Sequence, residues 1–276
     1  MNAADVKRFV KGIGNLSTIP LLLDKIQTIV WNENASPEKL YELIAADPAL
    51  AERVLRTANS VFFGHSGEIK SIKQAVLFLG FDRIKSIAIG MSVMNIFPAG
   101  SSFKVEKLWI HSYEVAFIAA ALSDVVAMTE PKECFLSGLL HDTGRIILYI
   151  MDHKAYLDIE TTDTMLEKES VVFGCTHAEA GAWFLEEIGM PPDIVSTTAY
   201  HHNPSGATEN RDMVSIVALA EALSRKLSPR IEDDGIWTRE HDAILLEFGL
   251  SETAILQLGE KFNEAKSEIE SFFSSS

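Results

Sequence analysis

The chain is punctuated along its length by signals that start and stop short helices. Ser36-Pro37 and Asp47-Pro48 each place a capping residue before a proline, which favours a helix beginning at that proline. Ser71–Gln74 and Thr176–Glu179 have the spacing of capping boxes. Apolar residues between these signals recur with helical period, and we see no alternation typical of a strand. The sequence therefore predicts an all-α fold.

A break in composition divides the predicted helices into groups. The segment Pro98–Lys104 is small, rich in Gly, Pro and Ser, and followed by a long helical pattern. We expect an N-terminal helical subdomain at residues 1–100, packed on a helical core at residues 101–230, with a helical extension at residues 231–276. Further helices are expected at Asp82–Phe97, Val105–Ala127, Lys132–Met151, Met213–Lys226 and Ser251–Phe273.

Composition excludes several classes of partner. The chain has 24 Lys and Arg against 39 Asp and Glu, and its net charge of −15 repels the phosphate backbone of a nucleic acid. No apolar stretch is long enough to span a membrane. Cys134 and Cys175 have neither metal-site nor disulfide spacing, so we expect small buried thiols. We therefore expect a cytoplasmic protein with no nucleic acid and no membrane among its partners.

Histidines recur where the predicted helices carry apolar faces. The segment FLSGLLHDTGRIIL places His141 beside Asp142 within two apolar runs, while His65, His153 and His241 lie in polar or loop contexts. A lone histidine on an apolar face is more often a hydrogen-bonded core residue, but several on successive helices beside an acid favour a metal site. The histidines of this set are His111, His141, His177, His201 and His202.

These residue types suit a centre with two metal ions. Imidazoles bind Fe, Mn, Zn or Ni, and one carboxylate can bridge two ions. Asp142 follows a histidine directly and is placed to bridge, and Glu221 is the one acid among the apolar residues of VSIVALAEALSRK. We expect a divalent metal centre, binuclear if both ions bind. The competing interpretation is a polar network satisfied by hydrogen bonds within the core, without metal.

The order of these residues resembles a known pattern. His111, His141-Asp142, His177, His201-His202 and Glu221 follow the H…HD…H…HH…D order of the HD phosphohydrolase superfamily. The earlier segment DPALAERVLRTANSVFFGHSGEIKSIKQAVLFLG is similar to HDOD proteins, the HD-related output domains of bacterial signalling. The resemblance covers residues 16–226, which would together form the HDOD region.

The resemblance implies an N-terminal helical subdomain on an HD-like helical core, and a role in signal output. All seven side chains should then converge on one cavity with Asp142 between two metal positions. One ion would take His111, His141 and Glu221, and the other would take His177, His201 and His202.

The sequence departs from active HD-GYP phosphodiesterases at several positions. Arg145 stands where their HDxGK motif has Lys, and Glu221 stands where they have Asp. Lys107 occupies the position of a further Glu ligand in trinuclear variants, and no GYP segment follows His177. If the protein is an enzyme, Asp142 and Arg145 are the candidate catalytic residues, with Arg145 in contact with a phosphate.

Three functions remain open from the sequence. The first is a regulatory module that acts through signalling proteins or a bound nucleotide, with a retained metal site. The second is a metal-dependent phosphohydrolase or phosphodiesterase acting on a nucleotide or cyclic dinucleotide. The third is a scaffold that binds no ligand. The altered HDxGK motif and the missing GYP segment favour the first.

Overall fold

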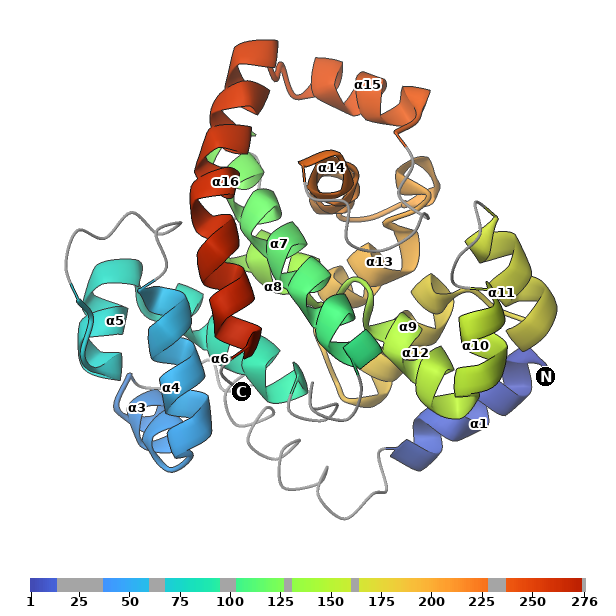
Figure 1. The fold of residues 1–276 in the computed structure, drawn as a ribbon, viewed down its shortest axis with the longest axis horizontal. Coiled ribbons are helices and arrows are strands. Elements are labelled where there is room, and N and C mark those ends of the chain that lie inside the picture. The colour runs from blue at the N-terminus through green and yellow to red at the C-terminus, as the bar shows by residue number, and fades with distance from the viewer. Residues whose placement is uncertain are drawn as a thin grey trace.

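The computed structural model describes residues 1–13, 37–59, 68–94, 103–126, 131–159, 164–227 and 237–274. All regular structure in these ranges is helical, which confirms the all-α prediction (Figure 1). No helix within these ranges is both long and apolar enough to cross a membrane. The predicted boundary near residue 100 and Ser36, the predicted cap of the first proline, lie outside the described residues.

Four helices form an N-terminal group, and their ends follow the predicted signals. Asp47 accepts a hydrogen bond from the backbone N–H of Leu50 at 3.1 Å, and Ser71 caps the third helix of the group. Gly80 ends that helix with a φ of 87°, a left-handed conformation that glycine adopts without strain. The group comprises α3 (Pro37–Ala45), α4 (Pro48–Ala58), α5 (Ile72–Leu79) and α6 (Phe81–Met94).

The core is organised around one long helix, α7 (Phe103–Val126). Every residue of α7 from 108 to 120 is buried, because other helices cover it on all sides. It packs against α8, α14 and α16, and α8 in turn packs against α6 of the N-terminal group (Figure 1). The other core helices are α8 (Pro131–Leu140), α9 (Thr143–Met151), α12 (His177–Glu187), α13 (Pro192–Tyr200) and α14 (Arg211–Leu227).

The remaining helices cover this core. The first helix packs on α12 and α9 of the core, although its residues fall within the predicted subdomain of residues 1–100 (Figure 1). The sequence analysis did not predict a helix there or at residues 239–247. The covering helices are α1 (Ala3–Ile13), α10 (His153–Ile159), α11 (Met165–Phe173), the 3-10 helix η3 (Pro204–Gly206), α15 (Arg239–Glu247) and α16 (Glu252–Ser274).

The prediction of one helix over Lys132–Met151 is wrong, because the chain turns at His141-Asp142 and forms two helices, α8 and α9. The hydroxyl of Thr143 donates to the carbonyl of Leu140 at 2.7 Å, which stabilises the turn. Gly144 follows, and a Cβ atom at this position would lie 1.8 Å from the carbonyl oxygen of His177. The backbone of α9 therefore contacts the first turn of α12 directly.

This close approach predicts a large effect of a single methyl group. Gly144→Ala should lower the free energy of unfolding by about 3 kcal/mol, the upper end for over-packed cores, because backbone atoms cannot move aside easily. Urea denaturation measures the change. Gly12→Ala in α1 is the control, since a Cβ there meets no atom within 4 Å, and it should cause no loss. Equal stability of Gly144→Ala and wild type would contradict the contact.

Candidate metal centre

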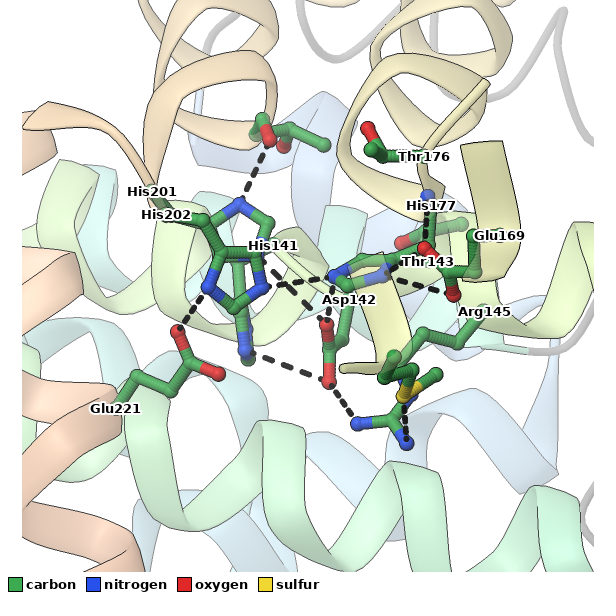
Figure 2. A network of polar contacts seen from close by, with 12 residues as sticks. His141, Asp142, Thr143, Arg145, Glu169, Thr176, His177, His201, His202 and Glu221 are labelled. Carbon is green, nitrogen blue, oxygen red and sulfur yellow. Dashed lines mark hydrogen bonds and ion pairs between the residues drawn. The ribbon is translucent and has the colours of Figure 1, made fainter. Parts of the chain in front are cut away.

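The structure brings together all seven side chains that the sequence analysis singled out. They come from five places in the fold, and Figure 2 shows Asp142 together with His141, His177, His201, His202 and Glu221. Three helix ends contribute most of them, because the first turn of α12, the end of α13 and the turn between α8 and α9 meet here. The set comprises His111 on α7, His141 and Asp142 in the turn, His177 on α12, His201 and His202 after α13, and Glu221 on α14.

One group of donor atoms lies on the Oδ1 side of Asp142. Asp142, His177, His201 and His202 each offer one atom, and these atoms all lie within 4.8 Å of one another. The Nε2 atoms of His177 and His201 are 3.2 Å and 3.8 Å from Asp142 Oδ1. The Nε2 atoms of His177 and His202 are 2.9 Å apart.

A second group lies on the Oδ2 side of the same carboxylate. His111, His141 and Glu221 offer atoms within 4.8 Å of one another. The Nε2 atoms of His141 and His111 are 3.6 Å and 3.8 Å from Asp142 Oδ2. Each oxygen of Asp142 therefore faces a different group, and the two groups have the membership expected for two ions. The ions themselves stay a prediction.

The outer nitrogens of two imidazoles fix the direction of their lone pairs. His141 Nδ1 lies 2.7 Å from the carbonyl oxygen of Gly138, and His201 Nδ1 lies 2.7 Å from that of Thr198. A carbonyl oxygen accepts but cannot donate, so each Nδ1 carries the proton. In the neutral ring, Nε2 then presents a lone pair toward Asp142.

Three of the inward-facing nitrogens have no hydrogen bond to any described residue. Within the described part of the chain, the Nε2 atoms of His111, His141 and His201 are buried without a hydrogen bond. A buried polar atom without a partner costs about 1–3 kcal/mol, and three such nitrogens converge here around one carboxylate. A cation satisfies such lone pairs together, and this nitrogen-rich set with carboxylate oxygens suits a divalent transition metal or zinc. The residues present therefore fit a metal centre better than a closed hydrogen-bond network.

The charge on Asp142 is stabilised from several sides. Burial alone would raise the pKa of this carboxyl, but His141, Arg145 and His177 outweigh burial and hold its pKa well below the usual range. The group is therefore ionised at neutral pH, as a bridging ligand must be.

The imidazoles differ in charge according to their neighbours. Burial lowers the pKa of His111, and Arg225 lowers it further. Burial also lowers the pKa of His201, and His202 lowers that pKa further. Both rings are therefore neutral and able to bind a metal. Burial would also lower the pKa of His177, but Glu169 and Asp142 outweigh burial and raise it well above the usual range.

Arg145 lies behind Asp142 rather than at a surface. Its side chain is fully buried, and its Nη1 lies 3.4 Å from Asp142 Oδ2. Its Nε donates to the hydroxyl of Tyr156 at 2.9 Å, and Nη2 lies 3.5 Å from the sulfur of Met165. The guanidinium therefore contacts Oδ2, the same carboxylate oxygen that faces His111 and His141. A contact between Arg145 and a phosphate, and a catalytic role for Asp142 and Arg145, stay predictions.

Glu169 on α11 is a residue of this site that the sequence analysis missed. It is fully buried, and its carboxylate accepts a hydrogen bond from the backbone N–H of His177 at 2.8 Å (Figure 2). A sequence signal exists, because Met165, Glu169 and Phe173 are four residues apart and all buried. An acid between two large apolar residues on one helical stripe indicates a buried carboxylate.

The other histidines lie apart from the centre. His153 is exposed on α10, and His241 accepts from the backbone N–H of Thr238 at 3.0 Å at the start of α15. His65 lies outside the described residues. Cys134 and Cys175 are buried free thiols, as expected.

The centre is nearly closed to solvent. The side chain of His202 is 11 % exposed, whereas the six others are at most 2 % exposed. Access to the donor atoms is therefore greatest on the side of His202 and α14.

Comparison with known proteins identifies the family. The HDOD domain model matches residues 16–204, more than half of the chain. The chain belongs to the HDOD family. This HDOD protein is 24 % identical over 226 residues to an uncharacterized protein of Treponema pallidum (strain Nichols), which covers 78 % of the chain. The chain spans 43 % of the length of that relative.

Solved structures share the fold. A candidate phosphohydrolase from Shewanella amazonensis SB2B has a TM-score of 0.77 at 23 % identity, over 99 % of this chain and 98 % of its own. A candidate signal transduction protein from Marinobacter aquaeolei VT8 has a TM-score of 0.70 at 20 % identity, over 91 % of this chain and 58 % of its own. At these identities the likeness shows the HDOD fold of the chain.

Metal binding should raise thermal stability through Asp142. After removal of metal with EDTA, Zn²⁺ at 100 times its dissociation constant should add about 2.7 kcal/mol to the free energy of unfolding. Asp142→Asn should lose most of the resulting rise in Tm, because the carboxylate faces both groups of donors. Each variant is compared with its own metal-free form by calorimetry.

The matched control is Asp158→Asn, at an exposed position on α10. It should keep the full rise in Tm. A rise that is equal in wild type and Asp142→Asn would show that Zn²⁺ binds elsewhere.

Proposed function

We propose that this HDOD protein is a cytoplasmic signal-output module with a retained binuclear metal centre, and that it acts through signalling proteins or a bound nucleotide. The observation that carries the proposal is a set of buried imidazole nitrogens that have no hydrogen bond to any described residue. They converge on a buried carboxylate whose two oxygens face separate donor groups. A scaffold without ligand would leave these buried acceptors unsatisfied.

The residues divide into ligands for two ions. His111, His141 and Glu221 would hold one ion, and a second group, His177, His201 and His202, would hold the other, with Asp142 shared between them. A bound divalent metal ion, whether Fe, Mn, Zn or Ni, supplies positive charge and Lewis acidity at this position. Arg145 orients Asp142 through its contact with Oδ2, and the outer hydrogen bonds of His141 and His201 orient their rings.

Burial of the centre supports regulation more than turnover. Metal ligands from α7, α12, α13, α14 and the turn before α9 would tie these helices to one point, so occupancy of the centre would be coupled to their packing. Such coupling can change the surface presented to a partner protein. The Marinobacter protein of the same fold is a candidate signal transduction protein, which agrees with this role.

Metal-dependent hydrolysis of a nucleotide or cyclic dinucleotide is the second candidate. The complete ligand set favours it, because a protein that needs only a scaffold has no need of seven convergent donors. The Shewanella protein of the same fold is a candidate phosphohydrolase. A substrate phosphate would have to enter beside His202, the most exposed of the seven side chains.

A hydrolysis screen separates the two functions. Wild type and Asp142→Asn are assayed on nucleotides and cyclic dinucleotides with added Mn²⁺ or Fe²⁺, and metal content is measured on the same samples. We expect metal in the wild type, and turnover no higher than in Asp142→Asn. Turnover by the wild type that Asp142→Asn abolishes, with the fold retained by circular dichroism, would establish the enzyme instead.

A further inference from the structure

The carboxylate of Glu169 is hydrogen-bonded to two groups of His177, its backbone N–H and its imidazole. The backbone N–H of His177 lies 2.8 Å from Glu169 Oε2, and His177 Nδ1 lies 2.8 Å from Oε2 and 3.1 Å from Oε1 (Figure 2). Both residues are fully buried, so water does not compete for these bonds. The first turn of α12 and its imidazole are therefore held by one carboxylate of α11.

These contacts decide which nitrogen of His177 carries a proton. Glu169 Oε2 already accepts from the backbone N–H of His177 and lies 2.8 Å from Nδ1, so Nδ1 is the donor toward this acceptor oxygen. The opposite nitrogen, Nε2, is thereby directed toward Asp142, at 3.2 Å from Oδ1. A metal ion binds an imidazole at a nitrogen that has given up its proton, and the hydrogen bond of the other nitrogen decides which of the two nitrogens that is.

We infer that Glu169 is a positioning residue of the metal centre, which keeps the proton of His177 on Nδ1 and makes Nε2 the ligand atom. The inference rests on the proposed function for the identity of what Nε2 binds. The hydrogen bond itself is independent of any metal.

The helices around Glu169 also help to position a second candidate ligand, Asp142. The same pair of helices, α10 and α11, also contacts the other side of the centre, because Tyr156 and Met165 both hold Arg145, which holds Asp142. The two helices therefore fix the orientation of two neighbouring ligands, His177 directly and Asp142 through Arg145.

Glu169→Gln tests the role with almost no change in side-chain volume. The amide oxygen can still accept from the backbone N–H of His177, but its NH₂ group then faces Nδ1 and requires an acceptor there. The proton should move to Nε2 and block that atom. We expect the affinity for Zn²⁺ to fall about 10–100-fold, as for other outer partners of metal-binding histidines.

Two readouts are measured on the full chain. Competitive titration gives the affinity for Zn²⁺, and ¹⁵N NMR of labelled histidine side chains, assigned with His177→Gln, shows which nitrogen of His177 is protonated. We expect a protonated Nδ1 in the wild type and its loss in Glu169→Gln. Glu167→Gln, at an exposed position on the same helix, is the matched control and should behave as wild type in both readouts.

The outcomes separate the inference from the function on which it rests. If the wild type binds no Zn²⁺ but Nδ1 of His177 is protonated and responds to Glu169→Gln, the positioning role stands and the metal centre fails. An unprotonated Nδ1 in the wild type overturns the inference, and this measurement decides even if Glu169→Gln does not fold. Unchanged Zn²⁺ affinity and an unchanged Nδ1 proton in a folded Glu169→Gln also overturn it.

Discussion

The arrangement of this protein depends on one fully buried carboxylate. A charge removed from water destabilises a fold by several kcal/mol unless cations and hydrogen-bond donors surround it. Asp142 meets that requirement with the guanidinium of Arg145 and the surrounding imidazoles. To bring these groups to one point, the chain breaks a helix at Asp142 and presses Gly144 against the backbone of His177. The packing of these helices and the stabilisation of the buried charge therefore depend on the same contacts.

The two oxygens of the Asp142 carboxylate face different groups of donor atoms. Oδ1 faces His177 and His201, whereas Oδ2 faces His111 and His141. A group shared in this way couples whatever binds on its two sides, because a shift that improves one contact changes the other. Since the ligands come from five places in the fold, the centre also couples the packing of helices that are distant in sequence. This coupling is the physical basis of the proposed regulatory role.

Much of the fold followed from local sequence signals. Asp47 and Ser71 cap helices as predicted, and Thr176 with Glu179 forms a complete capping box at the start of α12. Such contacts involve neighbouring residues, so their spacing is visible in one sequence. The members of the site could be named as well, because titratable side chains on apolar helical faces are rare and because their order resembles a known pattern.

The missed features depend on contacts between elements. The helix break before Gly144 is imposed by α12, and the docking of α1 on α12 and α9 involves surfaces that no local pattern pairs. Glu169 reaches His177 because the chain reverses at Gly174, with φ of 75°, between their helices. Arg145 would be exposed on most helices, and its burial follows from the carboxylate and the Tyr156 hydroxyl beside it. Long-range packing decides each of these.

Anomalous X-ray diffraction tests the central claim most directly. Crystals grown with Zn²⁺ are measured above and below the zinc absorption edge, so that each ion appears as a difference peak. We predict two peaks on opposite sides of the Asp142 carboxylate, one beside His111, His141 and Glu221 and the other beside His177, His201 and His202, with ligand distances near about 2.0–2.2 Å. Zn²⁺ bound at other positions, with these side chains closed on one another by hydrogen bonds, would contradict the account.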